Sequence, residues 1–183
     1  INWRDINQTP ELAEKAAKAQ SQREEALLVL VRDNSEYGKF ACSVLAHIFC
    51  YAGQLLGTIT NNPQDIDDAM KLGFNWQRGP FEMIDAIGQK YLYKLISDAG
   101  LPIPSALKFD KPFYELDEKR VFVLDTVKGY IPVSLPEGSF RLQILRRALP
   151  VLLENNDATC YAVEDNLRLV EFHSKANALR PGT

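Results

Sequence analysis

The sequence predicts a mainly α fold, in which a helical bundle is followed by a small α+β tail. Apolar residues recur at helical spacing through the first hundred residues, most clearly between Tyr37 and Leu56. After about Leu116, short apolar runs bounded by turn residues take over, which is typical of strands. We therefore expect a helical domain over residues 1–115, a linker of short strands and a helix over 116–155, and a further domain that begins at 156–183.

The composition excludes several classes of protein. The 183 residues are 46% hydrophobic and 25% charged, with a net charge of -3, as in an ordinary globular protein with a buried core. This charge gives no reason to expect nucleic acid or a membrane as partner. The longest apolar run, Ala26 to Val31, is too short to span a bilayer. Cys42, Cys50 and Cys160 have neither zinc-site nor disulfide-framework spacing, which fits a reducing, cytoplasmic location.

Two helices are predicted before residue 33. Thr9-Pro10 supplies a cap and a first-turn proline for a helix over Glu11 to Gln20. Ser21-Gln22-Arg23-Glu24 has the form of a capping box and predicts a second helix that ends at Arg32. One continuous helix is an equally good interpretation. The run Ala26 to Val31 could form a strand, but its helix-forming flanks favour a helix.

The clearest helix runs from about Tyr37 to Leu56. One face carries large apolar residues: Tyr37, Phe40, Ala41, Val44, Leu45, Ile48, Phe49, Ala52, Leu55 and Leu56. The other face carries small ones: Cys42, Ala46, Cys50, Gly53 and Gly57. We expect both faces to be buried, with a second helix closely approaching the small one. His47 is expected to be a hydrogen-bonded interior residue, because a general base needs an orienting acid and none lies nearby in sequence.

Shorter helices are predicted from residue 62 to residue 100. Asn62-Pro63 caps the first, and Gly73 ends it. Gly79-Pro80 starts the next, Gly88 interrupts the pattern, and Gly100 closes it. Residues 101–114 contain three prolines and are expected to be irregular, with at most one turn of helix.

The cluster of Asp65, Asp67 and Asp68 could suggest a metal site. Carboxylates in the first turns of a helix are usually solvated and stabilised by the helix dipole. No histidine or fourth acid lies near them in sequence, as a metal site would require. We therefore interpret the three aspartates as solvated residues of a helix start. The loop residues Phe74 and Trp76 are expected to fold back over the neighbouring helix junction.

The tail is predicted to contain four strands and one helix. The strands are Val121–Leu124, Tyr130–Val133, Thr159–Val163 and Leu167–Phe172, and the helix is Ser139–Ala148. The last two strands form a hairpin around Glu164-Asp165-Asn166. Because a lone hairpin is marginal in water and edge strands seek partners, we expect it to be poorly ordered, to pack on the helical domain or to pair with a neighbouring molecule.

The segment from Ile66 to Asp85 is the most specific motif in the sequence. Ile66–Gly73 and Gly79–Asp85 match the patterns I-D-x-A-M-x-x-G and G-P-F-x-x-x-D. These patterns resemble the signature of the 3-hydroxyacyl-CoA dehydrogenase C-terminal domain, and the similar region runs from about Tyr37 to Gly100. The resemblance implies a C-terminal-domain-like helical bundle from a longer enzyme of fatty-acid β-oxidation, which oxidises 3-hydroxyacyl-CoA to 3-oxoacyl-CoA with NAD.

A second resemblance lies in the tail. Asn156–Leu179, and above all Val170–Leu179 with His173, is similar to the opening hairpin and loop of an enoyl-CoA hydratase (crotonase) domain. In some bacterial multifunctional proteins such a domain follows two helical dehydrogenase modules. The resemblance therefore implies that this chain is the second module followed by the start of a hydratase, and that the parent enzyme also has hydratase activity.

The departures from the family decide what the chain is expected to do. No G-x-S-x-G, Walker A or G-x-G-x-x-G occurs, and Lys39–Ser43 lacks the asparagine that the family carries early in its long helix. We assign no catalytic, cofactor-binding or metal-binding residue.

We expect an inactive domain that packs on a sister helical module and on the nucleotide-binding domain that holds NAD, or that forms a dimer. One alternative is a complete small enzyme that uses His47 or Asp85 on a CoA thioester. The other is an unrelated all-helical protein-interaction domain.

Overall fold

The computed structural model describes residues 10–21, 25–108, 110–117, 120–138, 142, 146, 149–173 and 179. The chain forms two compact units, the first made of residues 1–114 with 123–131, the second of 115–122 with 132–183. The predicted capping residues 22–24, most of the predicted helix over 139–148 and the loop 174–178 of the hydratase resemblance lie outside the described residues.

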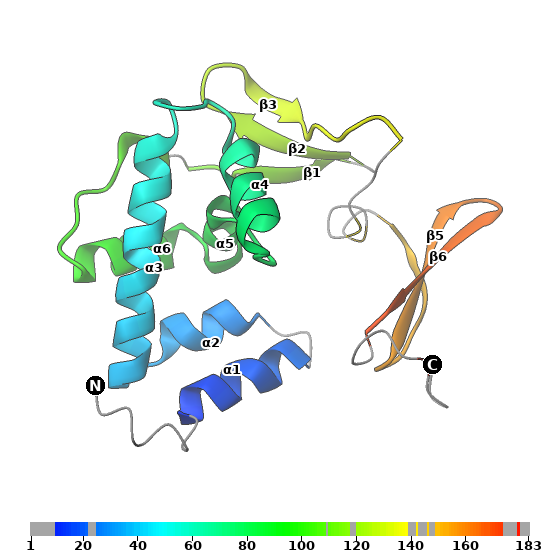
Figure 1. Cartoon of the computed structure of the whole chain (residues 1–183), viewed down its shortest axis with the longest axis horizontal. Helices are drawn as coiled ribbons and strands as arrows, with labels where there is room; N and C mark the ends of the chain where they lie inside the picture. Colours follow the sequence, from blue (N-terminus) through cyan, green and yellow to red (C-terminus); the bar gives the residue numbers. More distant parts are fainter. Residues whose placement is uncertain are drawn as a thin grey trace. The chain divides into compact units, whose positions relative to one another are not determined.

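The first unit is helical, as the sequence predicts (Figure 1). Its helical elements are α1 (Glu11–Ser21), α2 (Ala26–Arg32), α3 (Glu36–Leu55), α4 (Pro63–Phe74), α5 (Pro80–Ile87), α6 (Gln89–Asp98) and the 3-10 turn η2 (Ser105–Leu107). α1 and α2 are separate helices. The capping box predicted to open at Ser21 is wrong, because Ser21 ends α1 and Glu25 caps α2 by accepting the Leu27 amide at 3.2 Å.

The ends of the later helices largely follow the predicted turn residues. Asn62 caps α4 through its side chain, which accepts the Gln64 amide at 2.9 Å. The prediction that Gly73 ends α4 is wrong by one residue, because the helix runs to Phe74 and is followed by Asn75 in the left-handed conformation, with φ of 56°. Gly88, with φ of 79°, separates α5 from α6 as predicted.

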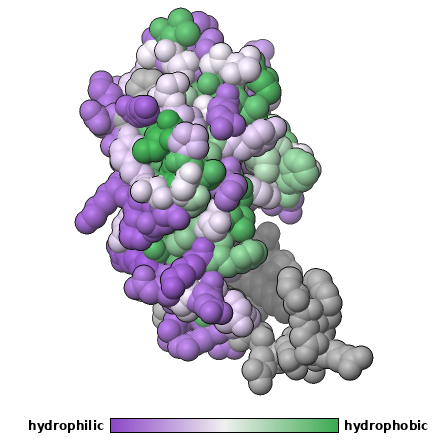
Figure 2. Space-filling view, turned by 90° about the vertical axis from the view of Figure 1, so that its left-hand side faces the viewer, coloured by the Kyte–Doolittle hydropathy of each residue, from purple (hydrophilic) through white to green (hydrophobic). Residues whose placement is uncertain are grey.

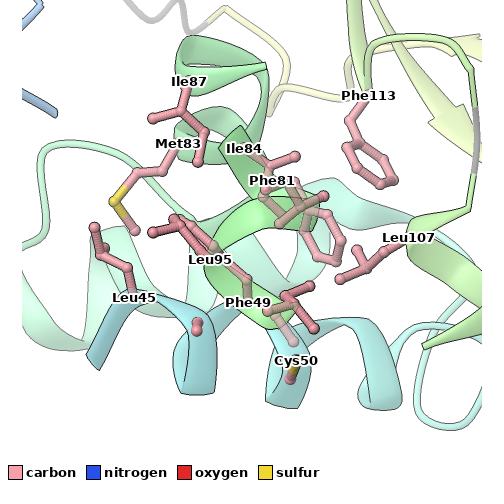
Figure 3. Close-up of a cluster of buried hydrophobic side chains, with 14 of the residues drawn as sticks. Leu45, Phe49, Cys50, Phe81, Met83, Ile84, Ile87, Leu95, Leu107 and Phe113 are labelled. Atoms are coloured by element: carbon pink, nitrogen blue, oxygen red, sulfur yellow. The ribbon is translucent and has the colours of Figure 1, made fainter. Parts of the chain in front are cut away.

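The core lies between α3, α5, α6 and the chain that follows α6 (Figure 3). Phe49 of α3 and Phe81 of α5 are fully buried, and the Phe81 ring meets the Phe113 ring edge-on at 4.7 Å. Full burial of such a side chain contributes about 1.5–3 kcal/mol. These large side chains therefore account for much of the stability of the unit.

The prediction that both faces of α3 are buried is only partly correct. Of the small face, Ala46, Cys50 and Gly53 lie in the core. Of the large face, Leu45, Phe49, Ala52 and Leu56 are buried beside them, whereas Tyr37, Phe40 and Val44 are exposed at 60%, 71% and 42%. The apolar pattern of the sequence is wider than the core, and only the tertiary packing decides which part of it is covered.

The close approach predicted at Gly53 is confirmed, but the approaching element is not a second α-helix. A β-carbon at Gly53 would lie 2.7 Å from Cγ of Leu107, which belongs to η2 and is almost fully buried. The approach expected at Gly57 is wrong, because no atom lies within 4 Å of a β-carbon built there. η2 is the one turn of helix predicted for residues 101–114.

A first three-stranded sheet has the order β1-β2-β3, with β1 (Tyr114–Asp117), β2 (Arg120–Asp125) and β3 (Gly129–Pro132). The strands β2 and β3 and the turn at Gly129, with φ of 77°, agree with the prediction. β1 was not predicted. The sheets make the description "mainly α" only partly correct for the described residues.

The second sheet has the order β4-β5-β6, with β4 (Val151–Glu154), β5 (Ala158–Glu164) and β6 (Leu167–Phe172). The predicted hairpin is confirmed, because β5 and β6 pair antiparallel with Cys160 opposite Val170. The expectation that it stands alone is wrong, because β4 pairs with β5 and places Leu153 opposite Cys160. β4 lies on the edge of the sheet, and its three apolar residues are exposed.

Apolar surface is not confined to the interior. Figure 2 shows apolar patches between hydrophilic ones on the side of the molecule that it displays. None of the helices in the described part of the chain has the length and hydrophobicity that crossing a bilayer requires.

Candidate functional site

The segment that resembles the dehydrogenase signature forms a corner between α4 and α5, and Asp67 lies at its centre. The Asp67 side chain is fully buried. Its Oδ1 accepts the Phe81 amide at 2.9 Å, and its Oδ2 accepts the Glu82 amide at 3.1 Å. The first amides of a helix have no partner within the helix, so Asp67 of α4 caps α5 from outside. The expectation of a solvated carboxylate is therefore wrong for Asp67.

A third donor reaches the same carboxylate from the start of β1. The Tyr114 hydroxyl donates to Oδ2 of Asp67 at 2.8 Å. Burial raises the pKa of Asp67 to about 7, although the bonds from Phe81 and Tyr114 oppose this shift. Burial, and after it the neighbouring Asp67, raise the pKa of Tyr114 well above its ordinary value. One carboxylate thus holds together α4, α5 and β1.

Gly79 is part of the same arrangement. A β-carbon at Gly79 would lie 2.3 Å from Cα, Cβ and Cγ of Asp67, so only glycine fits. Pro80 then begins α5, where its missing N–H costs nothing. Glu82 completes the cap, because its Oε2 accepts the Gly79 amide at 2.9 Å. The order Gly-Pro-Phe-Glu therefore has a physical reason at each of these positions.

The other two aspartates of α4 differ, because the prediction of a solvated side chain is confirmed for Asp65 and wrong for Asp68. Asp65 is exposed, and its Oδ2 accepts the Thr60 hydroxyl at 2.6 Å. Asp68 is largely buried and pairs with Lys71 at 3.3 Å. Lys71 also pairs with Glu82 at 2.8 Å, which links α4 to α5 a second time. Within the described residues, no group of three or more His, Cys, Asp or Glu side chains is placed to hold a metal ion.

Asp85 has a comparable role at the other end of α5. Its Oδ1 accepts the Phe113 amide and its Oδ2 accepts the Tyr114 amide, both at 2.8 Å. In the alternative that the chain is a complete small enzyme, Asp85 was a candidate catalyst acting on a CoA thioester. Both of its oxygens are instead bonded to the backbone that leads into β1. Sequence reasoning missed this role because the partners lie 28 and 29 residues away.

The two histidines are placed differently. His47 is exposed, so the prediction of an interior residue is wrong, although its Nδ1 is hydrogen-bonded to the Ser43 carbonyl at 2.7 Å. His173 is partly buried in the second unit, with Nε2 2.8 Å from the Thr159 hydroxyl and 4.0 Å from Glu171.

The two aromatic residues of the corner loop also differ. Trp76 packs against the core as predicted. Phe74 is 69% exposed, so the prediction that it covers the helix junction is wrong.

Comparison with known proteins shows to which protein family the corner is related. Residues 38–119 match the family described as 3-hydroxyacyl-CoA dehydrogenase, C-terminal domain. This part of the chain is homologous to that domain. The match begins in α3 and ends beyond β1, so Asp67, Gly79 and Asp85 all lie inside the dehydrogenase-type domain.

Relatives extend the homology along the chain. A Bacillus subtilis protein named "Probable 3-hydroxyacyl-CoA dehydrogenase" is 33% identical over 170 residues, which is 90% of this chain and 21% of that protein. A Rickettsia prowazekii protein, named as a fatty acid oxidation complex trifunctional enzyme, is 34% identical over 94 residues, or 50% of this chain and 13% of that protein. The chain thus spans about a fifth or less of these relatives. No solved structure matches the chain.

Proposed function

We propose that the chain is a non-catalytic helical domain of a longer, NAD-dependent 3-hydroxyacyl-CoA dehydrogenase of fatty-acid β-oxidation. One observation carries the proposal: the three conspicuous acids of the signature corner all accept backbone amides. Asp67 and Glu82 cap α5, and Asp85 holds the chain entering β1. Groups bonded in this way build a rigid corner, and they are not left to bind or protonate a substrate.

The residues of this chain do not fit NAD. Binding the pyrophosphate of a dinucleotide requires a glycine-rich turn that leads from a strand into the N-terminus of a helix. No G-x-G-x-x-G occurs in the 183 residues. The strands of the second sheet are antiparallel and joined by short turns. NAD and the acyl-CoA substrate therefore belong to other domains of the parent enzyme.

The role left for this domain is packing. Its partners in the parent enzyme are a sister helical module and the nucleotide-binding domain, with this chain as the second of two helical modules. The exposed apolar residues of α3 supply a surface for such packing. The hairpin β5–β6 supports the proposal that Asn156–Leu179 opens a crotonase-like domain. The cysteines Cys42, Cys50 and Cys160 are free, as is usual in the cytoplasm.

The proposal is tested with the isolated chain and with the parent enzyme. The chain is mixed with NAD and 3-hydroxybutyryl-CoA, and NADH formation is followed by absorbance against a heat-denatured control. We expect no turnover. Separately, the parent enzyme lacking this segment is expected to lose dehydrogenase activity, and the chain added in trans is expected to restore it. Turnover by the chain alone, or full activity of the truncated parent, would overturn the proposal.

A further inference from the structure

Only a small apolar surface holds α2 to the rest of the helical unit. The helix has seven residues, too few to be stable by itself in water. It packs against α3 and α5, and of its residues Val31 is buried, whereas Leu27 and Leu28 are partly buried. α2 also precedes residues 38–119, the part that is homologous to the dehydrogenase domain. Its helical state therefore depends on a few contacts with that domain.

One of these contacts lies at the start of α2. Glu25 caps the helix with one carboxylate oxygen and accepts a hydrogen bond from Arg78 with the other. The side chains of Glu25 and Arg78 are 24% and 35% exposed, so solvent partly screens this ion pair. Arg78 directly precedes Gly79 in the corner between α4 and α5. A single pair thus joins the N-terminal end of α2 to the signature corner.

The C-terminal end of α2 is held more firmly, by the backbone. Asp33 follows the helix, and its Oδ1 accepts the Ser35 amide at 2.8 Å. A β-carbon at Gly38 would lie 2.4 Å from the Asp33 carbonyl oxygen, which shows how tightly the chain turns from α2 into α3. Arg32 strengthens this end, because its Nε donates to the Tyr91 hydroxyl at 3.0 Å. The end of α2 that can open is therefore the end at Glu25.

We propose that α2 is a strap that opens from α3 and α5 about the turn at Asp33–Ser35 while the core stays folded, and that the Glu25–Arg78 pair is its latch. When the latch is closed, it ties the chain that precedes α2 to the α4–α5 corner. When it is open, the two move independently. The strap is a conformational device that goes beyond the packing role of the domain, because it does not depend on what the domain packs against.

Two cysteines of α3 can report the state of the strap. Cys42 lies against α2, with its Sγ 3.9 Å from the Leu30 carbonyl oxygen. Burial raises its pKa, so little of the reactive thiolate forms while the strap is closed. Cys50 is buried against another part of the chain, with its Sγ 3.8 Å from the Pro102 carbonyl oxygen. Reaction of Cys42 therefore reports opening of the strap, whereas reaction of Cys50 reports unfolding of the core.

The strap is tested by pulse labelling of the 183-residue chain with N-ethylmaleimide at neutral pH, read for each cysteine by mass spectrometry. Arg78→Gln removes the charge of the latch. It should label Cys42 about two- to fivefold faster than the wild type, the range for a partly exposed ion pair. The matched control is Arg78→Lys, which keeps the charge and should label close to the wild-type rate. Added salt should speed labelling of the wild type and leave Arg78→Gln unchanged.

A second variant tests whether the two latch residues act together. Glu25→Gln should speed the labelling of Cys42 as much as Arg78→Gln does, and the double variant should add nothing further. Additive effects would overturn the latch.

The remaining outcomes separate the strap from the proposed function. Labelling of Cys42 in Arg78→Gln at the wild-type rate, or equally fast in Arg78→Gln and Arg78→Lys, overturns the latch. Equal acceleration at Cys42 and Cys50 means that the whole unit unfolds, and overturns the strap. None of these results changes the NADH assay. Failure of the strap therefore leaves the proposed function standing, whereas turnover by the chain refutes the proposed function and leaves the strap.

Discussion

A β-carbon on Gly79 would lie 2.3 Å from the α-carbon of Asp67, which is closer than folded proteins allow. Gly79→Ala should therefore force α4 and α5 apart and weaken the cap on α5. We expect a loss of roughly 1–3 kcal/mol in the free energy of unfolding, the usual cost of overpacking. Urea denaturation measures it. The matched control is Gly73→Ala in α4, where a β-carbon meets no atom within 4 Å and where alanine should stabilise the helix by up to about 1 kcal/mol. Equal effects at the two glycines would contradict this account.

Gly53→Leu should destabilise the helical unit. Its helix propensity alone would favour the variant by up to about 1 kcal/mol. The new side chain, however, must enter space held by Leu107, whose Cγ would lie 2.7 Å from the new β-carbon. A net fall in melting temperature is expected. The second change Leu107→Ala should recover part of the loss in a double-mutant cycle. A Gly53→Leu variant that melts at or above the wild-type temperature would contradict this prediction, and would show that η2 can move away from α3 at little cost in stability.

Asp67 should make stability depend on pH around neutrality. In the folded chain its pKa is raised from 3.8 to about 7, chiefly by burial. The folded state therefore binds more protons than the unfolded state between these values, and stability falls as the pH rises through this interval. The titratable groups that act on the carboxyl are Tyr114, Glu82 of α5 and Lys71 of α4.

The comparison of wild type with Asp67→Asn isolates this effect. The stability of the wild type relative to the variant should decrease between about pH 4 and pH 7 and level off above, as measured by chemical denaturation at each pH. A difference that instead grows with pH would mean that the hydrogen-bond donors around Asp67 outweigh its burial.

Hydrogen exchange should distinguish the strands of the second sheet. β5 is the central strand and pairs with both neighbours, whereas β6 pairs with β5 alone. Amides of β5 should therefore exchange more slowly than the outward-facing amides of β6, and both more rapidly than the buried part of α3 near Phe49. Protection in β6 equal to that of α3 in a dilute monomer would mean that the tail is as stable as the helical core, and would count against a hydratase origin.

Local signals in the sequence were sufficient for most of the helices. Asn62-Pro63 and Gly79-Pro80 act within one turn of themselves, so the starts of α4 and α5 could be predicted. The burial of Asp67 could not, because its donors Phe81 and Tyr114 are 14 and 47 residues away. β4 was missed because Val151–Glu154 lacks the alternation of a half-buried strand, and all four of its residues are exposed.

The prediction that His47 is an interior residue failed for a related reason. The apolar pattern of α3 is wider than the face that the core covers, and the position of that face depends on contacts such as that between Gly53 and Leu107. The absence of assigned catalytic residues remains a prediction that the NADH assay will test. The acids of the corner are now explained by their bonds to backbone amides, which neither composition nor spacing could reveal.

Two carboxylates of the corner accept hydrogen bonds from two consecutive residues of the chain. Asp85 holds the amides of Phe113 and Tyr114, and Asp67 holds the Tyr114 hydroxyl. The chain leaves the first unit after Tyr114 and returns to it at Val123, where the Leu124 amide bonds the Phe113 carbonyl at 2.8 Å. A protein engineer who replaces the tail beyond Ile131 would therefore keep the corner, its three bonds and the returning strand together.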